Sequence, residues 1–222
     1  GVAHVHQGIP CRDVALDLVA GPSEIAVLAD DSADARHVAA DLLSQAEHGT
    51  GWEKALLVTP SSRLAYAVRR EFLIQMRSLP RRKAIQEVVK RFGVLIVVVD
   101  ELGDGVKLCN RFAPEHLELM VNRPRAWLGR IRTAGAVFLG WYTPESVGDF
   151  VAGPSHVLPT GGAAAMFSGL TVEDFRRRSS HIEFTRKDLS DTLPVIHAFG
   201  RVEGLDAHAR SAAIRFEKGE RV

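Results

Sequence analysis

The sequence is poor in cysteine and contains no long hydrophobic run. Only Cys11 and Cys109 occur among its 222 residues, far apart and without CxxC spacing. This pattern argues against a disulfide framework and predicts a reducing, cytoplasmic location. The longest apolar run, VLIVVV at 94–99, has the length of a strand, whereas a bilayer span needs ~18 residues. We therefore expect no membrane partner, and the start of the chain shows no signal-peptide pattern.

A strong excess of charge of either sign is also missing. The 28 Lys and Arg residues nearly balance 27 Asp and Glu residues, which leaves a formal net charge of +1. Such a balance provides no general attraction to nucleic acid or to anionic lipid. Hydrophobic residues make up 46% of the chain, enough to bury a real core at this length. Composition therefore predicts a globular protein without a nucleic-acid partner.

Three signatures of familiar sites do not occur. No GxGxxG opens a helix, no GK[ST] is present, and the chain lacks the GxSxG of a serine nucleophile. Neither cysteine has a neighbouring base that would activate its thiol. The sequence thus contains no nucleotide-binding fingerprint and favours neither a serine nor a cysteine nucleophile.

Strand-like and helical patterns alternate over residues 20–140. Runs rich in Val, Ile and Leu predict strands at 24–30, 54–60, 94–100, 117–121 and 134–140. Helices are expected at 33–47, 61–76, 81–92, about 101–113 and 124–131. Apolar strands separated by helices predict an α/β fold: a doubly wound, mostly parallel sheet with helices on both faces, as in a partial Rossmann-like domain. Ligands of such folds bind outside the carboxyl ends of the strands, so the loops there are where we expect the chemistry.

Periodicity is lost after Gly140. Residues 141–170 form a long Gly- and Pro-rich stretch whose aromatic residues favour a functional loop over disorder. The remainder combines helix-like TVEDFRRR, strand-like HIEFTR and helical VEGLDAHARSAAIRFEK, which predicts a small C-terminal α+β tail. We expect three regions: 1–19 of unclear affiliation, 20–160 as the α/β domain, and 161–222 as a tail or dimerisation segment. The first residue is Gly rather than Met, which suggests a start inside a longer or processed chain.

Two pairs of polar residues are candidates for metal binding or proton transfer. Gln45 and His48 are three apart near the end of the expected 33–47 helix, so they share one face and could hold one metal. A solvated last turn, with His48 favouring the helix dipole, explains the same pattern. Glu115 and His116 are adjacent, after Pro114 and before a strand, and could divide proton transfers between a carboxylate and an imidazole. An ordinary surface loop is the alternative.

Two further pairs occur in the C-terminal part of the chain. Asp149 and His156 lie in the glycine-rich stretch and offer an oxygen and a nitrogen ligand for zinc or a harder dication. Glu203 and His208 flank the start of the last expected helix, where a surface position is the simpler interpretation.

Several segments resemble, in order and spacing, the signature blocks of the histidinol dehydrogenase family. These are AGPSE at 20–24, DLLSQAEHG at 41–49, NRFAPEHLEL at 110–119, AGAVFLG and TPESVGDFVAGPSHVLPT within 134–160, FSGLTVEDF at 167–175 and EGLDAHARSAAIR at 203–215. The resemblance implies an NAD-linked oxidation of L-histidinol, through the aldehyde, to L-histidine, with one zinc ion per site. It covers only the C-terminal half of the family's chain. Most of the NAD-binding domain would thus be missing, and this chain alone is expected to be inactive.

The resemblance also implies a role for each matching residue. Four positions match the zinc ligands: Gln45, His48, Asp149 and His208. His116 matches the general base, Glu115 the residue that activates water, and Ser23, His156 and Glu203 the substrate contacts. In the family the site lies at a homodimer interface, with the segment of Glu203 and His208 reaching across from the other subunit. Two alternatives remain: a paralogue that oxidises another small alcohol, and a truncated, non-catalytic metal-binding or dimerisation module.

Overall fold

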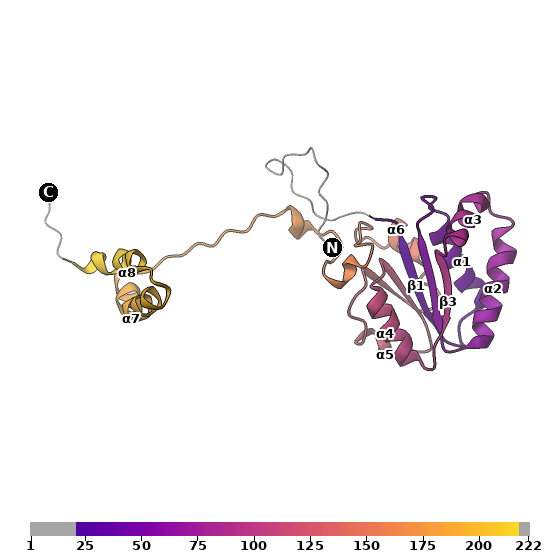
Figure 1. Cartoon of the computed structure of the whole chain (residues 1–222), viewed down its shortest axis with the longest axis horizontal. Helices are drawn as coiled ribbons and strands as arrows, with labels where there is room; N and C mark the ends of the chain where they lie inside the picture. Colours follow the sequence, from indigo (N-terminus) through magenta and orange to yellow (C-terminus); the bar gives the residue numbers. More distant parts are fainter. Residues whose placement is uncertain (1–20, 218–222) are drawn as a thin grey trace. The chain divides into compact units, whose positions relative to one another are not determined.

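The computed structural model describes residues 21–217, so the predicted N-terminal region 1–19 and Cys11 lie outside the described residues. The chain forms two compact units, the first ending at Arg176 and the second beginning at Arg177 (Figure 1). In the described part of the chain, no helix is both long enough and apolar enough to cross a membrane.

The first unit is built on a five-stranded sheet. Its strands are β1 (Glu24–Ala29), β2 (Lys54–Thr59), β3 (Val94–Val98), β4 (His116–Met120) and β5 (Ala136–Leu139). They are all parallel, in the order β3-β2-β1-β4-β5. The chain moves outward from β1 to β3 and then crosses to the other side of β1 for β4 and β5. This confirms the doubly wound parallel sheet predicted from the apolar strands.

Helices cover both faces of this sheet, as predicted. They are α1 (Ala35–Ala46), α2 (Ser62–Met76), α3 (Arg82–Lys90), α4 (Leu102–Phe112), α5 (Arg125–Leu128) and α6 (Glu145–Phe150). Side chains alternate between the faces along each strand. Ile25 and Val27 of β1 therefore join a core with α1, α2 and α3, whereas Ala26 and Leu28 join a second core with α4.

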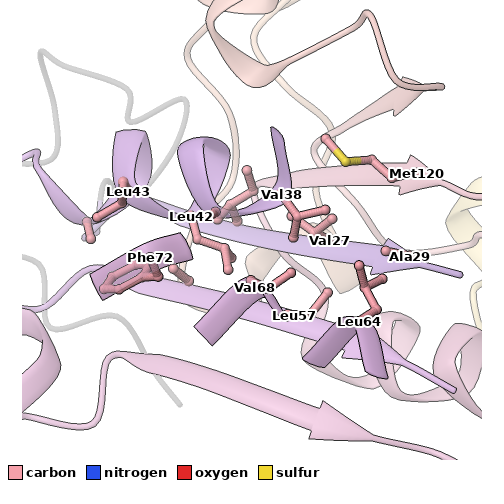
Figure 2. Packing of buried hydrophobic residues seen from close by; sticks show 14 of the residues in the cluster. Val27, Ala29, Val38, Leu42, Leu43, Leu57, Leu64, Val68, Phe72 and Met120 are labelled. Carbon is pink, nitrogen blue, oxygen red and sulfur yellow. The ribbon is translucent and has the colours of Figure 1, made fainter. Parts of the chain in front are cut away.

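The first core is made by apolar residues at helical spacing. Val38 and Leu42 of α1 and Val68 of α2 are fully buried against the sheet, and Figure 2 shows them beside Val27 and Leu57 of the strands. Helix α1 begins at Ala35, two residues later than the expected start at residue 33. The side chain of Asp34 accepts a hydrogen bond from the backbone N–H of Arg36 and so caps the helix.

The C-terminal tail differs from its prediction. The expected strand at HIEFTR does not form, and within the described part of residues 161–222 there are only helices. A strand needs a neighbour for its backbone hydrogen bonds, and residues 181–185 pair with no strand among residues 21–217. The expected α+β tail is therefore wrong in its β part. An unforeseen helix, α7 (Arg186–Glu203), starts at the capping box of Thr185 and Asp188 and ends at Gly204, after which α8 (Asp206–Ala213) begins.

Candidate metal and proton-transfer site

The predicted site residues of the first unit lie at the amino ends of the strands. Ser23 directly precedes β1, and Glu115 and His116 stand at the start of β4. Helices that return from parallel strands carry the chain back to this edge, so the end of α1 brings Gln45 and His48 there. The expectation that the chemistry sits after the carboxyl ends of the strands is wrong for this cluster. The reason is that its residues come from strand starts and helix ends.

Burial sets the proton affinities of Glu115 and His116. Their side chains face each other, with 3.8 Å between Oε2 of Glu115 and Nδ1 of His116. Burial raises the pKa of Glu115 to about 7, although the backbone N–H of Glu24 and the nearby hydroxyl of Ser23 favour its charged form. Burial lowers the pKa of His116 to about 4. At neutral pH the pair therefore combines a neutral imidazole with a carboxyl group close to half-ionised.

Helix α6 adds two carboxylates to this pair. Oδ1 of Asp149 lies 3.9 Å from Nε2 of His116. Potential ligand atoms of His116, Glu145 and Asp149 all lie within 4.8 Å of one another, so these three side chains could together hold a cation. Glu145 is absent from the sequence prediction. Its spacing of four residues from Asp149 in TPESVGDF places both on one helix face and could have revealed it.

Gln45 and His48 carry donor atoms suited to a metal. The amide of Gln45 is fully buried, and its Oε1 has no hydrogen-bond partner among the described residues. An unpaired buried amide oxygen is costly unless something outside the chain binds it. Nδ1 of His48 lies 3.0 Å from the backbone oxygen of Gln45 and can only donate to it. This hydrogen bond leaves Nε2 of His48 free as a ligand atom.

Two cavities meet at Asp149. One, of about 290 Å³, is lined by His48, Ser44, Glu145 and Asp149, so the end of α1 and the end of α6 face the same space. The other, of about 210 Å³, has His116, Asp149 and His156 among its walls. Its remaining lining is largely apolar and includes Phe138, Val147 and Leu158. This second cavity fits a small molecule that is part polar and part apolar.

Glu203 and His208 belong to the second unit. Glu203 is the last residue of α7 and His208 lies in the first turns of α8, on the two sides of Gly204. Both side chains are exposed. The remaining cysteine of the described chain, Cys109, is buried in α4, and burial raises the pKa of its thiol to about 12. At neutral pH this thiol is therefore protonated and is a poor nucleophile.

Comparison with known proteins gives one consistent result. The family model for histidinol dehydrogenase matches residues 2–216. A histidinol dehydrogenase of Geobacillus kaustophilus is 50% identical over 207 residues, which cover 93% of this chain and 48% of that protein. The corresponding protein of Heliobacterium mobile is 48% identical over 205 residues, covering 92% of this chain and 48% of the relative.

A solved structure agrees with these relatives. The crystal structure of histidinol dehydrogenase from Elizabethkingia anophelis matches with a TM-score of 0.87 at 34% sequence identity, covering 91% of this chain and 46% of that one. The chain thus spans about half the length of the relatives it matches, and what it spans corresponds to their C-terminal half. On this evidence the chain belongs to the histidinol dehydrogenase family.

Proposed function

We propose that this chain supplies the metal-binding and acid/base part of an enzyme that oxidises L-histidinol, through the aldehyde, to L-histidine in an NAD-linked, zinc-dependent reaction. The observation that carries the proposal is the buried Glu115–His116 pair, whose proton affinities are shifted in opposite directions, next to the carboxylate of Asp149. NAD would be bound mainly by a polypeptide equivalent to the half of the relatives that this chain does not span. The cytoplasm, as the site of small-molecule biosynthesis, is the proposed location.

The proposed zinc ligands from the first unit are Gln45, His48 and Asp149. A neutral amide oxygen, an imidazole nitrogen and one carboxylate oxygen suit Zn²⁺, and they leave coordination positions open. The free Nε2 of His48 and the unpaired Oε1 of Gln45 support this donor set. Bound zinc would anchor and orient the nitrogen atoms of the substrate. His208 is the proposed fourth protein ligand.

His116 and Glu115 are proposed to handle the protons. Neither nitrogen of His116 makes a well-formed hydrogen bond within the described residues, and its low pKa keeps the ring unprotonated at neutral pH. It can therefore accept a proton from the alcohol, and later from the aldehyde hydrate, as hydride leaves for NAD. The carboxyl of Glu115, with a pKa of about 7, can take the proton of a water molecule that attacks the aldehyde.

The proposed assembly is a homodimer that shares its sites. Ser23 and His156 would contact the substrate from one subunit, while Glu203 and His208 would reach in from the other, with the Glu203 carboxylate facing the substrate's ammonium group. Large exposed apolar side chains near the end of the first unit support an interface in this part of the chain. These are Met166, Phe167 and Phe175, between 54% and 80% exposed.

Zinc content tests the proposal directly. We would measure zinc per chain by elemental analysis after desalting, for the wild-type chain, Asp149→Asn and His208→Ala. His37→Ala, which changes an exposed histidine of α1, is the matched control. We expect about one zinc per chain in the wild type and the control, and a large loss in the other two. A folded wild-type chain without zinc would favour the truncated-module alternative.

Substrate identity needs a second measurement. The wild-type chain would be combined with a polypeptide equivalent to the missing half and supplied with NAD and L-histidinol. The Glu203 carboxylate favours a substrate with an amino group, because an uncharged alcohol leaves this carboxylate without a cation. Oxidation of a small alcohol without an amino group in preference to L-histidinol would instead support the paralogue alternative.

A further inference from the structure

Two hydrogen bonds join α6 to α1 and to β4. Oγ of Ser44 donates to Oε2 of Glu145 over 3.0 Å, although the two residues are 101 positions apart. The backbone N–H of Glu145 in turn donates to Oε1 of Glu118 over 2.8 Å. Ser44 is next to Gln45, and Glu145 lies one turn before Asp149. The two contacts therefore connect the helices that carry the proposed ligands.

Glu118 is an unusual residue for the middle of a buried strand. Its side chain is 1% exposed, and its neighbours in the sheet are Val27 of β1 and Phe138 of β5. Side chains alternate along β4, so Glu118 lies on the same face as His116 and Met120, which is the face that α1 covers. Leu117 and Leu119 belong to the core on the opposite face. Burying a carboxyl group here costs free energy that an apolar side chain would not cost. A contribution to stability therefore does not explain why a carboxyl group is present at this position.

The Glu118 carboxyl has two partners that hold it in place. One is the backbone N–H of Glu145 in the first turn of α6, which has no partner within its own helix. The other is the carboxyl of Asp41 on α1. A buried and a partly buried carboxyl group are compatible side by side when one keeps a proton, and loss of solvation raises the pKa of each. Glu118 thereby contacts both α1 and α6.

We propose that Glu118 is a positioning residue that sets the distance between the Gln45–His48 pair at the end of α1 and Asp149 on α6. The inference rests on the proposed metal-binding function and adds a residue that touches neither metal nor substrate. Without the carboxyl oxygen of Glu118, the backbone N–H of Glu145 in the first turn of α6 loses its acceptor on β4. Ser44 would then be the remaining polar link between the two helices.

The test compares zinc affinity with stability in several variants of the 222-residue chain. Glu118→Leu removes the acceptor, Glu118→Gln keeps an oxygen for the N–H of Glu145, and Ser44→Ala removes the second link. Met120→Leu changes a buried residue of the same strand and face that is outside the network, and it is the matched control. Zinc dissociation constants come from competition with a chelating dye, and stability of the metal-free chain from urea unfolding.

We expect Glu118→Leu to weaken zinc binding about 10- to 100-fold without a matching loss of metal-free stability. Glu118→Gln should recover most of the affinity, and Met120→Leu should bind zinc like the wild type. A purely structural role would instead lower affinity and stability together. Wild-type affinity in Glu118→Leu would overturn this inference alone, whereas absence of zinc from the folded wild type would overturn the proposed function and the inference with it.

Ser44→Ala keeps the inference testable if Glu118→Leu does not fold. The Ser44 hydroxyl is part-buried beside the cavity of about 290 Å³, so its removal leaves the core intact. We expect a several-fold loss of zinc affinity, smaller than that of Glu118→Leu. Unchanged affinity in Ser44→Ala would contradict the proposed link between α1 and α6.

Discussion

Nε2 of His116 lies 3.9 Å from Oδ1 of Asp149, which brings the start of β4 to the end of α6. This distance is too long for a hydrogen bond, so the Asp149 carboxylate is not hydrogen-bonded to Nε2 of His116. The two side chains also line the same small cavity. The arrangement leaves Asp149 able to bind a cation and His116 able to accept a proton. Metal binding and proton transfer can thus belong to different residues.

Replacement of His116 by asparagine distinguishes these roles. If His116 is the base and not a metal ligand, His116→Asn should keep the wild-type amount of zinc and abolish oxidation when the other half and NAD are supplied. Asp149→Asn should lose zinc in the same elemental analysis. Loss of zinc from His116→Asn would instead place the metal among His116, Glu145 and Asp149, whose ligand atoms are also close enough to hold it.

The partly buried Asp41 should make the metal-free chain less stable as pH rises. Burial raises its pKa from 3.8 to about 7, so the folded chain holds a proton that the unfolded chain has already released within this window. Stability is therefore fullest below the unfolded pKa and falls as pH rises toward about 7. Asp41→Asn should flatten this fall in urea unfolding measured from about pH 4 to about pH 8. An equally steep fall of stability with pH in Asp41→Asn would contradict the raised pKa of Asp41.

Gly135 lies where a side chain would disturb the acid/base pair. A Cβ atom there would be 2.6 Å from the backbone oxygen of Glu115 and 3.2 Å from Leu158 and Pro159. Gly135→Ala should lower the free energy of unfolding by about 1–3 kcal/mol, as crowding at a packed site does. Gly129→Ala is the control, because nothing lies within 4 Å of its Cβ and its φ of −64° suits alanine. That variant should be neutral or gain up to about 1 kcal/mol in urea unfolding.

Leu57 is the clearest test of the first core. It is fully buried in β2, between the helices of one face and the strands on either side. Leu57→Ala should cost about 2–5 kcal/mol of unfolding free energy, from lost burial and the cavity it leaves. Leu73→Ala on α2, where the side chain is 45% exposed, should cost distinctly less under the same conditions. Equal losses of unfolding free energy in the two variants would mean that Leu57 is not packed in the first core as the structure shows.

Local patterns were sufficient to predict the sheet. Between their polar ends, strands Glu24–Ala29 and Lys54–Thr59 are apolar because they are covered on both faces, and this marks them in the sequence. Patterns were less reliable where structure depends on distant partners. HIEFTR has strand-forming residues but no strand to pair with, and the Gly- and Pro-rich stretch after Gly140 hides α6.

The sequence by itself determined the parallel α/β architecture, the helix that carries Gln45 and ends just before His48, and the adjacency of Glu115 and His116. Only the tertiary structure decided that His48 and His116 lie near Asp149 at the amino edge of the sheet and that burial shifts the proton affinities of Glu115 and His116 in opposite directions. It also decided that Glu118 and Glu145 join the cluster. The physical reason is that spacing along the chain governs local hydrogen bonds and helix faces. Burial and contacts between distant residues depend on strand order.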